Sequence, residues 1–138
     1  MLQSIHEGLE KISNGMEKMN GNTNSFKEEH TLEERKKESQ RIKNEYPDRI
    51  PIIMIKNLDK LLPPLDKIKY LCPDDLTMGQ FVYVIRKRLR LRPEQAIYLF
   101  VGGHSIPSSH QNMAAIFKEH VDEDGFLYVL YAAESTFG

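Results

Sequence analysis

The chain has 138 residues, a formal net charge of −1 and a hydrophobic fraction of 40%, which suits one compact domain with an appended segment. The nearly neutral balance of charge favours no class of partner. No run approaches the roughly 20 apolar residues of a membrane-spanning helix, and residues 1–7 are too polar and acidic for a secretory signal. Any contact with a membrane is therefore expected to be peripheral or covalent.

The segment before residue 21 carries an apolar stripe. Its members are spaced alternately by three and four positions, as in an amphipathic helix, and are Leu2, Ile5, Leu9, Ile12, Met16 and Met19. The small, polar residues 21–25 predict a linker. We therefore divide the chain into an extension with its linker, residues 1–25, and a main domain, residues 26–138. The mixed charges of the extension favour packing against protein over a membrane surface.

The main domain begins with a predicted helix and a predicted strand. Thr31, followed three residues later by Glu34, fits a capping box for a helix over residues 32–45, which Pro47 ends. Residues 50–55 predict a strand rich in β-branched side chains. This strand is apolar on both faces, so the face away from the core needs cover from the helix, from a partner or from both.

A connecting loop over residues 57–67 leads to a short strand over residues 68–72. Pro73 stops this strand and cannot donate a ladder hydrogen bond, so the strand is expected at an edge of the sheet. The spacing of apolar residues then predicts a central helix over residues 77–91 with one buried face.

Three further elements complete the predicted domain. They are a strand over residues 96–101, a short helix over 112–120 and a strand over 126–132 that is entered through a turn at 122–125. After residue 46 the order is strand, strand, helix, strand, short helix, strand. That order suits a β-grasp sheet wrapped on one helix, an α+β architecture.

Seven runs of residues make the chain similar to a known family. They are FKEEH at 26–30, YPDRIP at 46–51, LDKIKYL at 65–71, DDLTMGQF at 74–81, IRKRL at 85–89, DGFLY at 124–128 and ESTFG at 134–138. In these runs the chain resembles the autophagy ubiquitin-like modifiers conjugated to phosphatidylethanolamine, which include microtubule-associated protein light chain 3 and the gamma-aminobutyric-acid-receptor-associated protein. The resemblance implies a ubiquitin-like β-grasp fold with two N-terminal helices, to which this chain adds its amphipathic extension.

Gly138 is the residue that the resemblance marks for conjugation. Glycine lacks a β-carbon and imposes the least steric cost on a chain end that enters a narrow active site. The resemblance implies that an activating enzyme and a conjugating enzyme join its carboxylate to phosphatidylethanolamine, and that a deconjugating cysteine protease reverses the bond. The nucleophilic cysteines belong to those enzymes, so we expect this chain to be no enzyme and to need no cofactor. It would be cytoplasmic and, after lipidation, bound to the autophagosomal membrane.

The resemblance also implies a groove beside residues 69–72, where an aromatic-x-x-aliphatic peptide of a cargo receptor or adaptor adds a strand to the sheet. One pocket would take the aromatic side chain between Glu38, Ile42, Pro51, Ile53, Lys69, Leu71 and Phe126. The second would take the aliphatic side chain beside Tyr70, Pro73, Leu76, Phe81, Val84 and Ile85. A basic rim would attract acidic residues that flank the motif, and consists of Arg49, Lys67, Lys69 and Arg88. The competing interpretation is that these apolar residues only pack under the helix at 32–45 or in the core.

Other interpretations remain for several features. The basic run 86–92 suggests nucleic acid, but its leucines belong to a helix face and it lacks aromatic residues for stacking. The acidic residues at 122–125 lack calcium-loop spacing and the histidines lack metal-ligand spacing. The single cysteine, Cys72, is expected to be a buried structural thiol. Residues 1–25 could self-associate, lie over the groove and regulate it, or be a fused partner segment. For the whole chain, the alternative function is that of a non-conjugated adaptor in vesicle or cytoskeletal trafficking.

Overall fold

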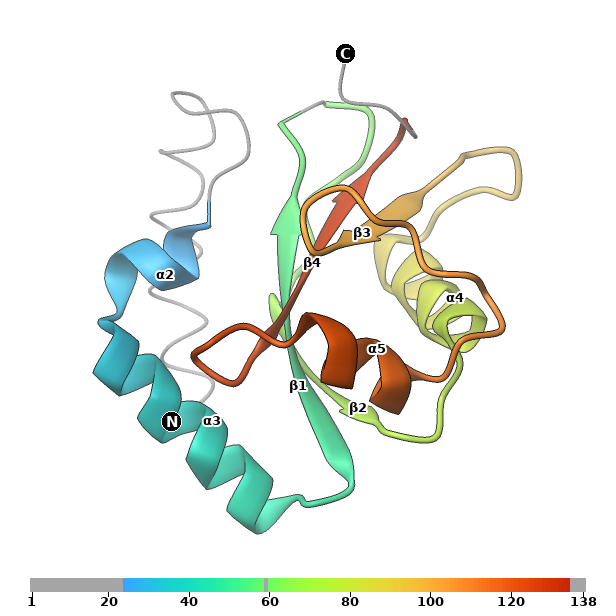
Figure 1. The fold of residues 1–138 in the computed structure, drawn as a ribbon. Helices are drawn as coiled ribbons and strands as arrows, with labels where there is room; N and C mark the ends of the chain where they lie inside the picture. Colours follow the sequence, from blue (N-terminus) through green and yellow to red (C-terminus); the bar gives the residue numbers. More distant parts are fainter. Residues whose placement is uncertain (1–23, 59, 135–138) are drawn as a thin grey trace.

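The fold is a mixed sheet with helices on both faces, seen here in a computed structural model that describes residues 24–58 and 60–134 (Figure 1). The sheet has four strands in the order β2-β1-β4-β3. These strands are β1 (Arg49–Lys56), β2 (Lys69–Pro73), β3 (Tyr98–Val101) and β4 (Leu127–Ala132). The central pair β1 and β4 is parallel and the two outer pairs are antiparallel. β2 is therefore an edge strand, which confirms the prediction made from Pro73.

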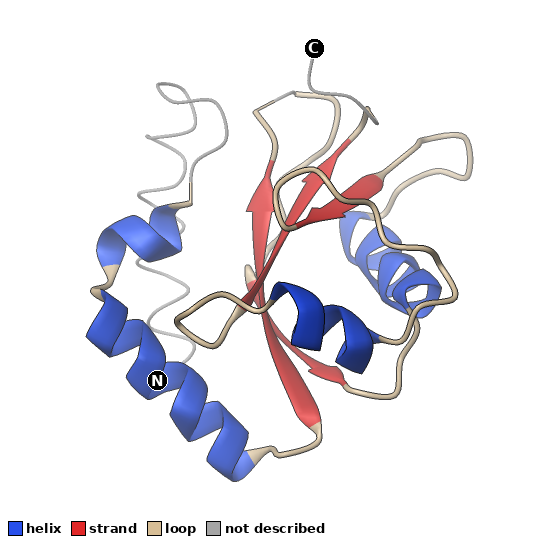
Figure 2. Cartoon of the chain, viewed as in Figure 1, coloured by secondary structure: helices blue, strands red, loops and turns tan. Residues whose placement is uncertain are grey.

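The helices lie on opposite sides of the sheet (Figure 2). The first pair is α2 (Ser25–Glu29) and α3 (Leu32–Glu45), and the second is α4 (Met78–Leu89) and α5 (Met113–His120). α4 packs on one face, where its apolar stripe joins the main core, and α3 packs on the other. This arrangement confirms the α+β class. Within the described residues, no helix combines the length and apolar character needed to cross a bilayer.

Alternation along β1 explains why both faces are covered. Ile50, Ile52 and Met54 point to the main core beneath α4, whereas Ile53 points to a smaller cluster beneath α3. All four side chains are at most 4% exposed. The strand is thus apolar on both sides because two layers of helix bury it from both sides.

Local capping sets the ends of the two long helices. Thr31 and Glu34 form the predicted capping box of α3, and Thr77 forms an equivalent box with Gln80 at the start of α4. α4 ends at Leu89, two residues before the predicted end, because Arg90 adopts the left-handed conformation at φ 56°.

The other differences from the predicted bounds are small. α2 begins at Ser25, the last residue assigned to the linker, and this serine is buried. β3 begins at Tyr98 rather than at residue 96, and β4 begins one residue after Phe126.

The loop over residues 57–67 is tied to the core. Leu62 and Leu65 are buried in the main cluster. The Tyr131 hydroxyl accepts a hydrogen bond from the Leu65 amide at 3.1 Å and donates one to the Pro63 carbonyl at 3.2 Å. These contacts fix the segment that leads directly into β2, and so help to place the edge strand.

Candidate functional site

The candidate site is built around the outer side of β2. β2 pairs with β1 from Arg49 opposite Pro73 to Ile53 opposite Lys69, which engages one side of the strand. No described strand pairs with its other side. An extended peptide could therefore extend the sheet at this edge through backbone hydrogen bonds.

The residues predicted for the first pocket do come together, under α3. Ile42, Ile53 and Phe126 form a cluster in which none is more than 1% exposed, and Leu71 packs against it half-buried. Pro51, on the same face of β1, is also buried. In this structure these residues are covered and leave no open pocket among them. Phe26, which was not predicted to belong to the pocket, completes the buried cluster.

Phe26 comes from α2 and is 2% exposed. Its ring meets the Phe126 ring edge-on at 5.1 Å between centroids and lies 5.0 Å from the His30 ring. Edge-to-face pairs of this kind are favourable beyond the area that they bury. The signal that could have revealed Phe26 is an aromatic residue directly after a polar linker and close to the start of a capped helix.

Lys69 does not lie on an exposed rim, so that part of the rim prediction is wrong. Its side chain is 6% exposed, and its Nζ lies 5.1 Å from the Phe26 ring centroid and 5.7 Å from that of Phe126. Two aromatic faces and its own aliphatic stem shelter the ammonium group, as is common for long basic side chains on apolar surfaces.

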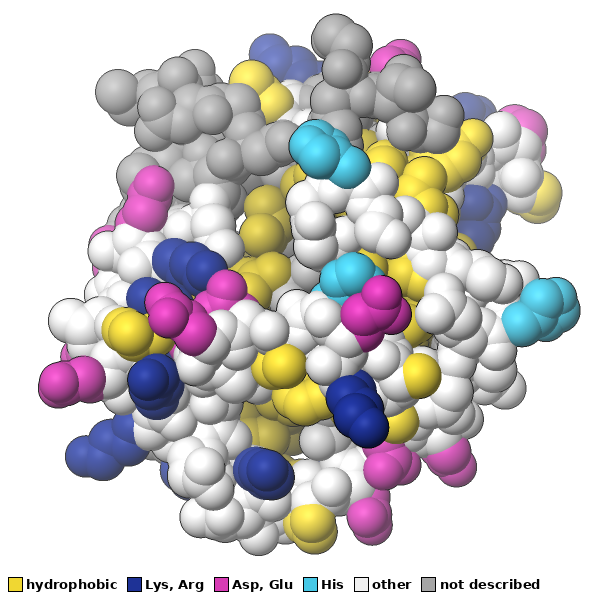
Figure 3. Space-filling view, viewed as in Figure 1, with side chains coloured by type: hydrophobic (Ala, Val, Ile, Leu, Met, Phe, Trp, Pro, Cys, Tyr) yellow, Lys and Arg dark blue, Asp and Glu magenta, His cyan; other side chains and the backbone are white. Residues whose placement is uncertain are grey.

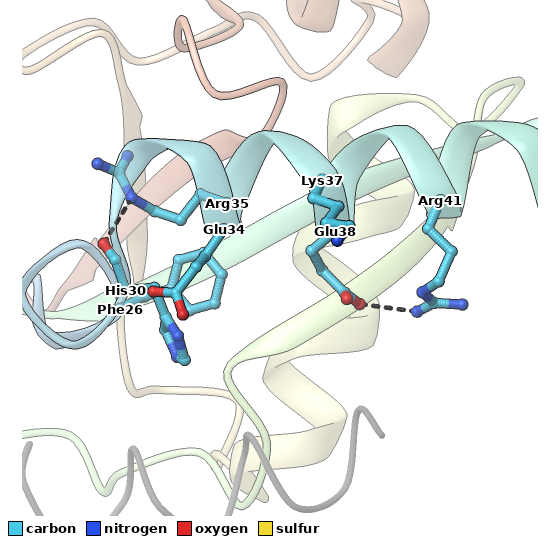
Figure 4. A pocket seen from close by; sticks show the side chains of 7 residues that line it. All are labelled: Phe26, His30, Glu34, Arg35, Lys37, Glu38 and Arg41. Atoms are coloured by element: carbon cyan, nitrogen blue, oxygen red, sulfur yellow. Dashed lines mark hydrogen bonds and ion pairs between the residues drawn. The ribbon is translucent and has the colours of Figure 1, made fainter.

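The charge of Lys69 is only partly compensated. Glu38 Oε1 lies 3.7 Å from Lys69 Nζ, and among the described residues the ammonium has no hydrogen-bond acceptor. Glu38 itself pairs with Arg41 at 2.7 Å (Figure 4). Arg41 also contacts Glu45 at 3.0 Å. Burial lowers the pKa of Lys69, Glu38 opposes that shift, and Arg41 adds to it.

The residues predicted for the second pocket divide into two groups. Phe81 and Ile85 on α4 belong to the main core, being 2% and 0% exposed, so for them the packing interpretation holds. The other four are less buried: Tyr70 and Pro73 of β2 and Leu76 just after it are half-buried, and Val84 on α4 is exposed.

Tyr70 has an unusual hydroxyl. The oxygen is buried and has no hydrogen-bond partner among the described residues. Burial, assisted by Asp66, raises the pKa of Tyr70 to about 12. A buried hydroxyl without a partner is costly, so a ligand group that hydrogen-bonds to it would gain free energy.

The three remaining rim residues are exposed and lie around β2. Arg49 faces Pro73 at one end of the strand and its Nη1 donates to the Leu71 carbonyl at 3.4 Å. Lys67 precedes the other end of β2, and Arg88 lies near the end of α4. These cations could pair with acidic residues of a peptide that extends the sheet at β2.

The turn at 122–125 anchors α2 and α3 to the sheet, a role that its sequence did not reveal. The Asp124 carboxylate is fully buried and accepts hydrogen bonds from Arg35 at 2.7 Å, from the Tyr128 hydroxyl and from the Phe126 amide at 2.9 Å. Lys27 of α2 pairs with Asp122 at 2.7 Å. The prediction that these residues form a turn rather than a calcium loop is consistent with this network.

Gly125 lets α3 approach the turn closely. Its φ is +91°, and a β-carbon at this position would lie 2.4 Å from Ser39 Oγ. That hydroxyl donates a hydrogen bond to the Asp124 carbonyl. Both the backbone conformation and the close approach therefore require glycine here.

The described residues hold no group of three or more histidine, cysteine or acidic side chains that could bind a metal ion. Cys72 is buried, as predicted, and desolvation raises its pKa to about 12, which disfavours the nucleophilic thiolate. Gly138 and the apolar stripe of the extension lie outside the described residues.

Comparison with known proteins gives consistent results. The family model described as "Autophagy protein Atg8 ubiquitin like" matches residues 34–138. Autophagy-related protein 8 of Mycosarcoma maydis is 56% identical over 114 residues, which cover 83% of this chain and 96% of that protein. Autophagy-related protein 8d of Arabidopsis thaliana is 54% identical over 114 residues, with coverage of 83% and 94%.

A solved structure agrees with these sequence matches. The crystal structure of Trypanosoma brucei ATG8 matches this fold with a TM-score of 0.76 and 40% sequence identity, covering 84% of this chain and 99% of that one. The predicted ubiquitin-like fold is therefore confirmed. The chain belongs to the Atg8 family of ubiquitin-like autophagy proteins.

Proposed function

We propose that this protein is a ubiquitin-like modifier whose Gly138 is joined to phosphatidylethanolamine, and that it recruits cargo receptors and adaptors through the outer side of β2. The docking proposal rests on the outer side of β2, which pairs with no strand of the described residues. This edge lies between a closed aromatic cluster and a half-buried apolar surface. The first would receive the aromatic residue of an aromatic-x-x-aliphatic motif. The second, around Tyr70 and Leu76, would receive the aliphatic residue.

Docking at the first position requires the cluster to open. Ile42, Ile53 and Phe126 are fully covered, so a peptide ring has to displace part of the cover supplied by Phe26 and Lys69. Exposing a phenylalanine costs roughly 1.5–3 kcal/mol, and an incoming aromatic ring recovers a similar amount. Lys69 would regain solvent or an acidic partner on the peptide, which relieves its desolvation.

The exposed cations tune this interaction. Arg49, Lys67 and Arg88 would each form a pair with an acidic flanking residue worth about 0–1 kcal/mol, so they affect rate and selectivity more than affinity. Titration calorimetry with an aromatic-x-x-aliphatic peptide tests the site. The double substitution Tyr70→Ala with Leu71→Ala should abolish the binding heat, whereas Tyr83→Ala, on an exposed face of α4, should leave it unchanged. Unchanged affinity in the double variant would refute the site.

The conjugation proposal rests on family membership and on the place of the last strand. β4 ends at Ala132, six residues before Gly138, and six extended residues reach about 20 Å. Such a length of chain suffices for a carboxylate to enter the active sites of an activating enzyme, a conjugating enzyme and a deconjugating cysteine protease. The product would carry two acyl chains, which anchor a protein firmly to a bilayer where a single chain does not.

The modified protein would then divide between the cytoplasm and the autophagosomal membrane. Reconstitution with the family's activating and conjugating enzymes, ATP and phosphatidylethanolamine liposomes should yield a lipid adduct that intact-mass spectrometry detects. A chain that binds the peptide but never forms the adduct would instead be a non-conjugated adaptor.

A further inference from the structure

The sheet has a second apolar area, on the face opposite α4. Ile55 of β1 is paired in register with Leu130 of β4, and Leu130 is paired with Phe100 of β3. The three side chains form a row across neighbouring strands, on the face that also carries Ile53. α2 and α3 cover the part of this face around Ile53, and the row lies beyond it.

A hollow opens over this row, and Figure 3 shows hydrophobic side chains at the bottom of a cleft beside the α2 and α3 side of the molecule. Besides the row, the lining residues are Asn24, Lys27, Gly102, Gly103, His120, Asp122 and Tyr128. The rim is fixed by Lys27, which pairs with Asp122 at 2.7 Å and lies 4.8 Å above the Tyr128 ring. An apolar floor with a polar rim is the form of surface that accepts an amphipathic segment.

The described chain begins at this hollow. Asn24 lines it, and its side chain caps α2 by accepting a hydrogen bond from the Lys27 amide. Residues 1–23 are therefore attached at the rim. Their apolar stripe, with Leu9 and Ile12 at its centre, has the spacing of one helix face.

The dimensions fit. A helix over residues 2–19 would be about 27 Å long, whereas three neighbouring strands span about 10 Å, so such a helix could cross the whole row. The four residues 20–23 can bridge up to about 14 Å between the stripe and Asn24. A short tether also gives an effective concentration in the millimolar range, so even a weak contact would be occupied.

We propose that residues 1–23 pack within the same molecule onto the row formed by Ile55, Leu130 and Phe100. The charged residues of the segment, including Glu10 and Lys11, then face solvent. This assigns the extension to the β3 side of the sheet. The row includes no residue of β2, so the extension on this face and a peptide at the outer side of β2 occupy different parts of the sheet.

A nitroxide attached to the full chain through Asn14→Cys tests this contact by nuclear magnetic resonance. Position 14 lies off the apolar stripe, and Cys72 is buried and unreactive, so a single label is expected and mass spectrometry verifies it. The amide signals of Phe100 and Leu130 should lose most of their intensity, and those of Lys69–Cys72 in β2 should keep a larger share of theirs. Broadening at β2 in place of β3 and β4, or no broadening in either, overturns the proposal.

Two matched pairs of substitutions sharpen the test. Leu9→Gln with Ile12→Gln removes the centre of the stripe and should restore the signals of Phe100 and Leu130. Glu10→Gln with Lys11→Gln changes only neighbouring polar positions and should leave those signals broadened. If both pairs behave alike, the apolar stripe is not the docking element and the proposal fails.

A mixed sample distinguishes contact within one molecule from contact between copies. Nitrogen-15-labelled protein without nitroxide is combined with nitroxide-bearing protein without nitrogen-15, and its signals should stay sharp. Broadening at Phe100 and Leu130 in this sample would assign the row to a second copy and overturn the proposal. None of these results depends on lipid conjugation or peptide docking, so they can fail independently of the proposed function.

Discussion

The ammonium group of Lys69 lies 5.1 Å from the centroid of the Phe26 ring, and together these two side chains close the cluster beside the edge strand. The pairing joins α2 at the start of the domain to β2. It explains how the proposed pocket for an aromatic side chain stays covered when no peptide is bound. Any guest at this position competes with these two residues, so their substitution should change stability and affinity in separable ways.

Phe26→Ala should destabilise the fold and raise affinity for the peptide. Removing a buried phenylalanine costs about 3–5 kcal/mol of unfolding free energy, while it also removes the ring that an aromatic guest must displace. Denaturant unfolding and calorimetry measure the two effects. Tyr83→Ala, at a side chain 58% exposed, should change stability by less than about 0.5 kcal/mol. A Phe26→Ala variant with unchanged stability would show that the cluster is not closed in solution.

Lys69→Met should flatten the pH dependence of stability on the alkaline side. Burial holds the pKa of Lys69 below its ordinary value of 10.5, so the unfolded chain binds this proton more tightly than the folded chain does. Stability of the wild type therefore gains from this group as pH rises from the lowered pKa towards 10.5, and the methionine substitution removes that gain. Unfolding at several pH values up to about 10 measures the difference between the two proteins.

The exposed Lys67 provides the matched control for that comparison. Lys67 lies two residues before Lys69, is exposed and is not part of the cluster around Phe26. The substitution Lys67→Met removes the same charge as Lys69→Met does. If Lys69→Met changes the pH dependence no more than Lys67→Met does, the effect comes from the loss of one positive charge and not from the burial of Lys69.

Gly125→Ala should be more damaging than Gly103→Ala. Both glycines have positive φ, +91° and +94°, but a β-carbon at Gly125 would lie 2.4 Å from Ser39 Oγ whereas nothing lies within 4 Å at Gly103. Backbone strain alone costs about 1–3 kcal/mol, so the excess at position 125 measures the close approach of α3. Equal losses of unfolding free energy in the two variants would contradict that contact.

Asp124→Asn should lower the unfolding free energy by about 3–5 kcal/mol, because it leaves Arg35 without its buried carboxylate. Glu123→Gln, one position earlier and exposed, is the control and should have little effect. Thermal unfolding followed by circular dichroism compares them. If α3 depends on this anchor, hydrogen exchange in Leu32–Glu45 should also accelerate in the Asp124 variant.

Elements with a strong local pattern were predictable from the sequence. The capping box at Thr31, the proline stop at Pro73 and the apolar spacing of α4 each act within a few residues, and each element appears within two residues of its predicted bounds. The short helix α2 carries no periodicity of its own, and was expected only through the family resemblance. The local sequence does not predict the left-handed conformation of Arg90, because glycine is the usual residue in this conformation at the end of a helix.

The site was less predictable because its geometry depends on distant contacts. Lys69 could point outward or inward along its flexible stem, and the rings of Phe26 and Phe126 that shelter it come from opposite ends of the domain. The pair between Arg35 and Asp124 joins residues 89 positions apart. The hydrogen bond from the Leu65 amide to the Tyr131 hydroxyl joins residues 66 positions apart. No pattern along the sequence encodes such pairings.

Conjugation at Gly138 is tested most directly by intact-mass spectrometry after incubation with the activating enzyme, the conjugating enzyme, ATP and liposomes that contain phosphatidylethanolamine. We expect a mass increase equal to one phosphatidylethanolamine less one water. Fragmentation should locate it on Gly138, and it should be absent when ATP or that lipid is omitted. A Gly138→Pro variant should remain unmodified yet bind the docking peptide normally. A wild-type chain that stays unmodified in the complete reaction, or an adduct on any other residue, would refute conjugation through Gly138.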